Sequence, residues 1–297
     1  MSLPVEVIEA VRQGKCLLFV GSRFAMEAAD DAGLEYPEAK DLAKELGWKK
    51  PKLAIGQKAK AVVASVEEGC AIQEQAAGRA ALVSALRKRV DPEVKPIAAH
   101  KSAIAHFPLI FTTCADELLE AAARELGKPV DVLDRGQAIP DSDPGRCTLV
   151  RLRGSFSRPD SLMLTPADYL ARALGPDARK QLRTLIRNNV VFFVGYRADE
   201  EEFERLFAEL SDAYGGELPR CHLACGQGTI DDFLWQKWVW RGLLLFLSDP
   251  GEAMKELEAR LAWAIASPAR RSSRSGPTTA ITPRRWASPF RRSPRSS

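Results

Sequence analysis

The sequence predicts an α/β protein built on a parallel β-sheet with helices on both faces and a helical insertion. Two observations predict the sheet: short apolar runs recur along the chain, and helical patterns alternate with them. A third observation, an alanine-rich helical stretch between the first two runs, predicts the insertion. The chain has 297 residues, of which 45% are hydrophobic and 28% charged, and this composition supports a sizeable core.

The apolar runs and the helical patterns follow one another in a regular order. Strands are expected at residues 16–20, 109–113, 148–152, 190–194, 220–224 and 242–247. Helices are expected at residues 4–13, 100–107, 116–126, 200–210 and 250–266. Because strands and helices alternate, we expect the strands to run parallel and to be covered on both faces.

Two stretches depart from this alternation. The helical patterns at 38–48 and 57–90 are rich in alanine and predict a cap or insertion at about residues 38–95. Residues 268–297 are mostly serine, arginine and proline, with too little apolar surface to offset the entropy of ordering, so a disordered tail is expected. The predicted organisation is one domain at 1–267 and a tail at 268–297.

The tail also carries the basic charge. It contains eight arginines and no acidic residue, so subtracting these eight from the formal net charge of +4 leaves −4 for residues 1–267. Such a tail can attract nucleic acid weakly and without sequence preference. The folded part gives no comparable basic signal.

Hydropathy and cysteine usage indicate a cytoplasmic protein. No apolar stretch reaches the roughly 20 residues that span a bilayer, and the N-terminal residues lack the long apolar core of a secretory signal. The six cysteines are scattered rather than spaced as a disulfide framework. We expect most of them to be reduced and structural.

The first predicted strand leads into a turn that is typical of phosphate-binding loops but lacks their small residues. Gly21 follows the apolar run at 16–20, where a strand-to-helix turn can cradle a phosphate. Such a loop favours small residues next, because backbone N–H groups must approach the ligand closely. The chain instead has Ser22, Arg23 and Phe24.

Four segments, taken in order, resemble the SIR2-like family, the sirtuin-related NAD-binding proteins that are widespread in bacteria. Residues 17–28 (LLFVGSRFAMEA) resemble the family's first strand and Gly-Ala-Gly loop. Residues 109–122 (LIFTTCADELLEAA) resemble its Thr-Thr-Asn-Tyr-Asp motif and the following helix. Residues 149–170 (LVRLRGSFSRPDSLMLTPADYL) resemble the Leu-His-Gly segment with its run to Thr-x-x-Asp-Tyr, and residues 190–210 (VVFFVGYRADEEEFERLFAEL) resemble Phe-Val-Gly-Tyr-Ser and its helix.

The resemblance reaches from about residue 8 to 262 and implies a Rossmann-like sheet with a helical insertion. It implies that NAD binds at the carboxyl ends of the strands, where all four segments fall. In the family the bond to nicotinamide is then cleaved, for acyl transfer or simply to hydrolyse NAD. The resemblance implies no metal, and it assigns contacts with NAD or ADP-ribose to Gly21, Ser22, Arg23, Thr112, Thr113, Asp116, Gly154, Gly195 and Tyr196.

The sequence departs from the family pattern at the catalytic positions. Cys114 stands in place of the asparagine that positions water or ribose, and Ala115 in place of the tyrosine after it, whereas Asp116 is retained. Arg153 stands in place of the histidine that serves as general base. Because an arginine stays protonated near neutral pH, it cannot take a proton, and no residue is assigned as the base.

Two further positions exchange a small residue for a cation. Arg23 replaces the second glycine of the first loop, and Arg197 replaces the serine of the fourth motif. Two roles are open for Arg23: its guanidinium can pair with a phosphate, or it can fill the space of the pyrophosphate. A side chain that pairs with Asp116 or Glu27 in the cleft would plug the pocket, whereas one that points to solvent would leave binding open.

Cys114 has two interpretations. It ends a predicted strand and precedes a helix whose N-terminus lowers a thiol pKa, which favours an activated nucleophile. No histidine can be placed beside it from the sequence, which favours a neutral replacement in an altered pocket.

The remaining chemical groups favour structural roles. The segment CHLAC at 221–225 holds two thiols and His222, but a structural zinc site needs a second pair, and strand alternation separates His222 from both cysteines. His100 and His106 are six residues apart, which places them on different faces of a helix. Three tryptophans at 235–240 fit a core or domain edge better than stacking on a base or nicotinamide.

These residues together predict a SIR2-like domain with impaired catalysis that acts as a nucleotide-sensing, regulatory or scaffolding module, in bacterial defence or signalling as the family often does. The alternative is an active NAD hydrolase with a rearranged site, in which Asp116 drives cleavage to nicotinamide and ADP-ribose. The expected partners are a nucleotide, another protein or a second copy of the chain.

Overall fold

The structure is a computed structural model that describes residues 2–31, 33, 66–90, 94–141, 143, 145–226 and 230–266. The predicted helix at 38–48, the first part of the pattern at 57–90 and the tail at 268–297 lie outside these residues. None of the described helices combines the length and the apolar character that a membrane crossing requires.

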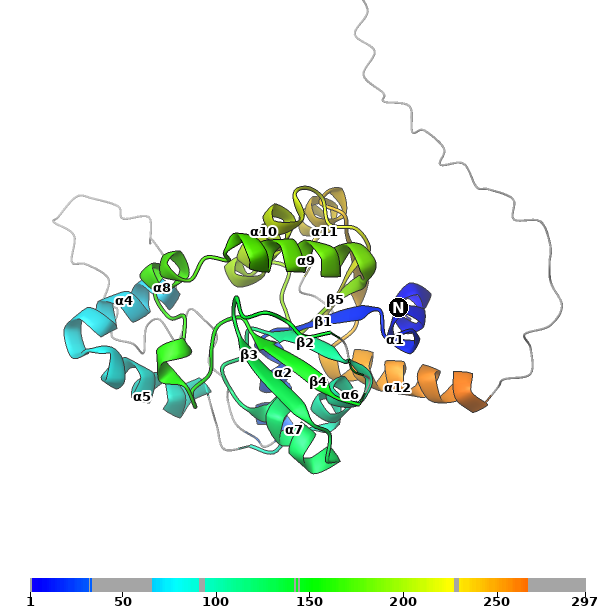
Figure 1. Cartoon of the computed structure of the whole chain (residues 1–297), viewed down its shortest axis with the longest axis horizontal. Coiled ribbons are helices and arrows are strands. Elements are labelled where there is room, and N and C mark those ends of the chain that lie inside the picture. Colours follow the sequence, from blue (N-terminus) through cyan, green and yellow to red (C-terminus); the bar gives the residue numbers. More distant parts are fainter. Residues whose placement is uncertain are drawn as a thin grey trace, which may run out of the picture.

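Seven parallel strands form one sheet in the described part of the chain (Figure 1). They are β1 Cys16–Val20, β2 Leu109–Thr112, β3 Val130–Asp134, β4 Cys147–Arg151, β5 Val190–Val194, β6 Cys221–Cys225 and β7 Leu243–Leu247. Their order across the sheet is β3-β4-β2-β1-β5-β6-β7, and every neighbouring pair is parallel. The predicted parallel sheet is confirmed, and the carboxyl ends of all its strands meet at one edge.

Strand β3 is the one that the sequence pattern misses. All of its residues are half-buried, and in the described sheet it pairs with β4 alone. Asp131 and Asp134 interrupt its apolar pattern, which an edge strand tolerates because one of its sides is not paired. The prediction of six strands is therefore wrong by one.

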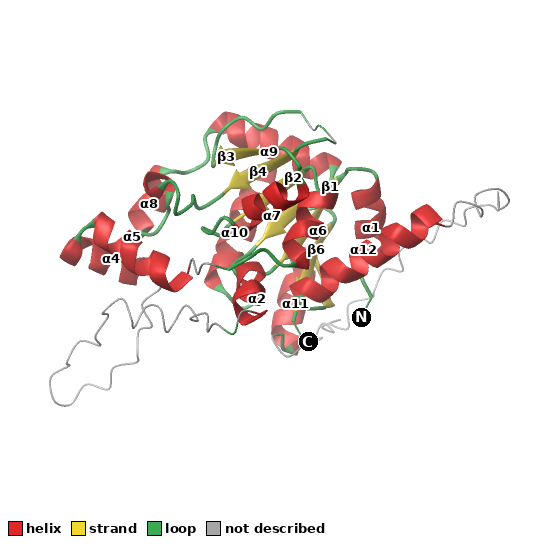
Figure 2. Cartoon of the chain, turned by 90° about the horizontal axis from the view of Figure 1, so that it is seen from below, coloured by secondary structure: helices red, strands yellow, loops and turns green. Residues whose placement is uncertain are grey.

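Helices cover both faces of the sheet (Figures 1 and 2). One face carries α1 (Val5–Arg12), α2 (Arg23–Asp31), α6 (Ala98–His106), α7 (Leu118–Leu126) and α12 (Pro250–Ala266). The other carries α9 (Pro176–Asn188), α10 (Glu201–Tyr214) and α11 (Asp232–Trp240). Alternate side chains of β1 enter the two cores, Leu18 on the first face and Phe19 on the second, as strands covered on both faces require.

The helices predicted at 4–13, 100–107, 116–126, 200–210 and 250–266 are confirmed, but α8 (Pro166–Ala171), α9 and α11 were not predicted. In α9 only Leu182 and Ile186 are buried, so its apolar stripe is narrow within an arginine-rich segment. In α11 tryptophans lie on several sides of the helix, which hides the helical period.

A third group of helices lies beside the sheet rather than on either face (Figure 1). α4 (Val66–Ala77) and α5 (Arg79–Val90) meet at Gly78, where a φ of 85° needs a residue without a Cβ. They share a small apolar core with the segment after β4, made of Cys70, Leu82, Val83, Leu86, Phe156 and Leu162. The described part of the expected insertion is thus helical, while its boundaries at 38 and 95 stay a prediction.

Candidate functional site

Two glycines bring the loops after β1 and β5 into direct contact. The N–H of Gly21 donates to the carbonyl of Val194 (2.9 Å), and that of Arg23 to the carbonyl of Gly195 (3.0 Å). A Cβ at position 21 would lie 2.5 Å from the carbonyl oxygen of Gly195 and 2.6 Å from the ring of Tyr196. The close packing of the two loops therefore explains by itself why position 21 is glycine.

Four of the five backbone N–H groups from Gly21 to Ala25 donate within the protein. The N–H of Phe24 donates to the carbonyl of Gly21 (3.0 Å), and that of Ala25 to the carbonyl of Ser22 (3.2 Å). The N–H groups of Gly21 and Arg23 are bonded as well, and the fifth group is that of Ser22. Since a phosphate-binding loop works through several N–H groups that face the ligand, this loop fits the backbone cradle of a pyrophosphate poorly.

Arg23 stands at the first position of α2 and is half-buried. Its charge acts on the segment between β5 and α10: the pKa of Asp199 is lowered, chiefly by the hydrogen bond from Arg197 and in smaller part by Arg23. Arg197 itself pairs with Asp199 at 2.6 Å. Arg197, the cation predicted at this position, therefore forms its ion pair within its own loop.

The two carboxylates considered as partners of Arg23 accept hydrogen bonds elsewhere. An oxygen of Asp116 accepts one from the N–H of Leu118 (3.0 Å), and an oxygen of Glu27 accepts one from the N–H of Gly251 (3.0 Å). The contacts described for these two carboxylates thus lead to the backbone of α7 and α12 rather than to Arg23.

The loop after β2 is tied to the carboxyl end of β1. The carbonyl of Val20 accepts hydrogen bonds from the N–H of Thr113 (3.0 Å), the hydroxyl of Thr112 (3.3 Å) and the hydroxyl of Tyr196 (3.0 Å). The hydroxyl of Thr113 lies 3.3 Å from that of Tyr196. The predicted site residues Thr112, Thr113 and Tyr196 thus lie together, and their polar groups link the carboxyl ends of the strands.

Cys114 lies against the first loop as a neutral hydrogen-bond donor. Its Sγ donates to the carbonyl of Gly21 (3.1 Å), and its N–H donates to the hydroxyl of Thr112 (3.0 Å). Burial raises the pKa of the Cys114 thiol well above its usual range, and Asp116 raises it further. A thiol in this state is not an activated nucleophile, so the structure favours the neutral replacement.

Arg151, at the end of β4, is a buried cation that sequence reasoning missed. Its side chain is only 1% exposed. It forms an ion pair with Glu120 of α7 and donates to the carbonyl of Cys114 (2.8 Å). Arg151 therefore fixes the backbone of the loop after β2, and an arginine inside the apolar run TLVRL is the sequence signal that points to it.

Arg153, which the resemblance assigns to the position of the family's histidine, contacts residues of three helices. Its guanidinium lies 3.5 Å from Glu67 of α4 and 3.4 Å from Glu202 of α10, and it stacks over the ring of Tyr169 of α8 at 5.3 Å. Arg205 of α10 stacks on Tyr169 as well, at 4.8 Å, and contacts Glu67 at 3.3 Å. We call Glu67, Arg153, Tyr169, Glu202 and Arg205 the arginine cluster.

The arginine cluster keeps Arg153 charged. Burial lowers the pKa of its guanidinium, but Glu202, Tyr169 and Glu67 outweigh that effect, so the pKa is raised above its usual value. Burial in the cluster also raises the pKa of Tyr169 to about 12. Neither the Arg153 guanidinium nor the protonated Tyr169 hydroxyl can act as a general base near neutral pH.

Gly154 turns the chain from Arg153 toward α8. Its φ is 79°, and a Cβ there would lie 2.3 Å from the backbone carbonyl of Ser161. The hydroxyl of Ser161 accepts a hydrogen bond from the N–H of Ser155 (3.1 Å). This predicted contact residue thus has a structural reason to be glycine.

The other candidates take the structural places expected of them. All six cysteines are free and buried. His222 lies on the opposite side of β6 from Cys221 and Cys225, with its Nε2 3.1 Å from a carboxylate oxygen of Glu6. His100 is buried edge-on against Phe24, whereas His106 is half-buried on another side of α6. Among the described residues no His, Cys, Asp and Glu side chains gather as a metal site requires.

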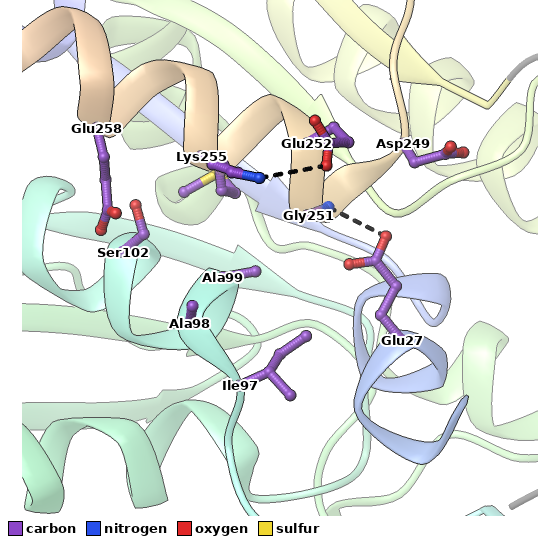
Figure 3. Close-up of a pocket in the computed structure, with 11 residues that line it drawn as sticks. Glu27, Ile97, Ala98, Ala99, Ser102, Asp249, Gly251, Glu252, Lys255 and Glu258 are labelled. Atoms are coloured by element: carbon purple, nitrogen blue, oxygen red, sulfur yellow. Dashed lines mark hydrogen bonds and ion pairs between the residues drawn. The ribbon is translucent and has the colours of Figure 1, made fainter. Parts of the chain in front are cut away.

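A cavity of about 400 Å³ lies between α2, α6 and the N-terminal part of α12 (Figure 3). Glu27 reaches across from α2 to the backbone of Gly251, and Lys255 lies 3.9 Å from Glu252. Asp249 and Glu258 also line it, so carboxylates outnumber the single lysine. Apart from Glu27, no residue discussed as part of the site lines this cavity, and its negative charge disfavours a phosphate.

Comparison with known proteins gives a partial family match. Residues 108–237 match the family described as the SIR2-like domain. This range runs from the start of β2 into α11 and contains three of the four segments that carry the resemblance, so the resemblance is confirmed there. The segment at 17–28 lies outside it. A comparison with curated proteins gave no match.

The solved structures include 76 matching chains. One of them comes from work on the structural basis for the mechanism and regulation of Sir2 enzymes. It is 11% identical in sequence, with a TM-score of 0.47, and the match covers 89% of this chain and 100% of the other.

Proposed function

Because residues 108–237 match the SIR2-like domain, we propose that the chain is a SIR2-like module that no longer turns NAD over and serves a nucleotide-sensing, regulatory or scaffolding role. The observation that carries this proposal is Arg153. It occupies the position of the general base and is paired with Glu67 and Glu202. A guanidinium held between two carboxylates cannot accept the proton that the reaction must remove.

Cys114, Tyr196 and Asp116 do not take over that role in this proposal. The Cys114 thiol is buried with a raised pKa, and the Tyr196 hydroxyl is buried with a pKa raised well above its usual range. Asp116 is retained, and its carboxylate accepts a hydrogen bond from the N–H of Leu118 at the start of α7. This contact supports a capping role for Asp116.

The residues present fit a bound nucleotide only in part. Four of the five N–H groups from Gly21 to Ala25 are engaged, so a pyrophosphate has to be held mainly by side chains rather than by the backbone. Arg23 is the cation at that loop, and a guanidinium can pair with a phosphate. A nucleotide that depends on Arg23 makes the module a sensor, whereas a module that binds none is a scaffold.

The test follows the released nicotinamide and the melting temperature together. Purified protein incubated with NAD should release no nicotinamide above the buffer background. Release that disappears in the Asp116→Asn variant would support the alternative, an active NAD hydrolase. A saturable rise in melting temperature with NAD or ADP-ribose, lost in Arg23→Ala, would assign the sensing role, and no rise would assign the scaffold.

A further inference from the structure

Helix α11 presents an apolar stripe to solvent. Phe233 is 75% exposed, Trp240 81% and Val239 41%. Phe233 and Trp240 are seven residues apart, so they lie two turns apart on one side of the helix, with exposed Gln236 between them. Two aromatic side chains this exposed on so short a helix form a patch that indicates a binding surface.

The opposite side of α11 is anchored, so the stripe is presented on a fixed element. Trp238 is buried and donates from Nε1 to the carbonyl of Ala198 (2.9 Å). Asp231 caps the helix by accepting a hydrogen bond from the N–H of Leu234 (2.8 Å). The guanidinium of Arg241 stacks over the ring of Trp238 at 4.6 Å.

We infer that a second copy of this chain docks on this stripe, with the two α11 helices antiparallel. In a two-fold arrangement contacts occur in pairs: if one residue of the first copy contacts another residue of the second, the same contact is repeated with the two copies exchanged. An axis beside Gln236 places Phe233 against Trp240 of the second copy, and Trp240 against Phe233 of the second copy. The stripe is therefore self-complementary in the antiparallel direction.

The charges along α11 favour the same direction. Its N-terminal end carries Asp231 and Asp232, and its C-terminal half carries Lys237 and Arg241. Glu204 of α10 contacts both cations, which leaves one positive charge in excess at that end. An antiparallel pair brings each acidic end beside a basic end, and a parallel pair would bring like charges together.

The area of the stripe predicts a weak dimer. An aromatic side chain buries about 150–250 Å² when fully covered, so two of them at these exposures supply about 250–400 Å² per copy. The total stays below the roughly 1,200 Å² of a standard stable interface. We therefore expect a dimer that forms in the micromolar range and dissociates on dilution.

Sedimentation equilibrium of the full chain over the micromolar range tests the surface. The wild type should show a concentration-dependent dimer, and Trp240→Glu should raise the dissociation constant at least about tenfold. The matched control is Trp263→Glu on α12, because Trp263 is 72% exposed but lies on a different helix. A chain that stays monomeric throughout, or an equal loss in both variants, would overturn the proposal.

A cysteine beside the two-fold axis tests whether the α11 stripe lies between the two copies. Gln236→Cys should form a disulfide between two copies under mild oxidation, seen as a band of doubled mass on a non-reducing gel. The six native cysteines are buried, so they give no background. Ser84→Cys, at an exposed position of α5, should give no such band. A Gln236→Cys protein that self-associates without cross-linking would contradict docking on this stripe, and cross-linking of both variants alike would contradict a specific surface. Phe233→Cys tests the direction, because it should cross-link only in a parallel pair, and a strong Phe233→Cys band would contradict the antiparallel pair.

Discussion

The loops after β1 and β5 and the segment after β4 lie at the same edge of the sheet, but different residues hold them. Gly21 and Gly195 are the positions that the resemblance assigns to family glycines, and here they let two loops touch. Arg153 is the position that the resemblance assigns to the family's histidine, and it joins the sheet to α4, α8 and α10. The comparison teaches that both kept and exchanged positions can serve packing, so a kept motif alone does not indicate a working site.

The largest expected effect comes from breaking the first region. Gly21→Ala should destabilise the protein by about 3 kcal/mol or more, because the new Cβ would lie 2.5 Å from a backbone carbonyl. Gly175→Ala is the matched control, since nothing lies within 4 Å of its Cβ. Urea unfolding measures both, and a Gly21→Ala protein as stable as the control would show that the loops are not in close contact.

The second prediction uses the pH dependence of stability to test the packing of Phe24, which belongs to the same region. His100 packs on Phe24, and burial lowers its pKa from 6.5 to about 4. The unfolded chain then binds more protons between these values, so this stabilisation is complete above pH 6.5 and is lost as the pH falls. The loss should reach about 3 kcal/mol near pH 4.

The variant for this test is His100→Asn, whose side-chain oxygen can accept the hydrogen bond that Nδ1 takes from the N–H of Ile97 (3.3 Å). The free energy of unfolding should fall less steeply with acid in the variant than in the wild type. Identical slopes would mean that His100 is not buried in its neutral form.

The third prediction breaks the second region. Arg153→Ala should cost about 2 kcal/mol, because it leaves Glu67 and Glu202 without one cation and uncovers Tyr169. Arg158→Ala removes a more exposed arginine paired with Asp134 and should cost at most about 0.5 kcal/mol. Equal costs in urea unfolding would remove the distinction between a cluster that holds the helices and an ordinary surface pair.

The smallest expected effect is an absence of reaction. Iodoacetamide at neutral pH should leave Cys114 unmodified in the folded protein, because its thiol is buried and its pKa is raised. Peptide mass spectrometry locates the modified residues, and unfolded protein serves as the positive control. Rapid alkylation of Cys114 alone would restore the nucleophile interpretation.

Local patterns in the sequence predict the frame of the fold. The strands at 16–20 and 190–194 match β1 and β5 to the residue, because central strands are continuous apolar runs. Strand β3 and helix α9 escape this approach, since an edge strand with two aspartates and a helix with two buried residues leave weak patterns. The resemblance placed Cys114 and Arg153 in the site.

The partners of these residues were not predictable from local patterns. Glu67 and Arg153 are 86 residues apart in the chain, and only the fold brings them together. Tyr169 belongs to the Thr-x-x-Asp-Tyr run, which the sequence displays without indicating that two arginines stack on its ring. The pairing of the first loop's N–H groups likewise depends on Gly195, far along the chain.

The release of nicotinamide from NAD by the wild-type chain tests the central claim most directly. With Arg153 at the position that the resemblance assigns to the base and four of the first loop's five N–H groups engaged, the account predicts no release above buffer even after long incubation at high protein concentration. Release that scales with protein concentration and is abolished in Asp116→Asn would contradict it.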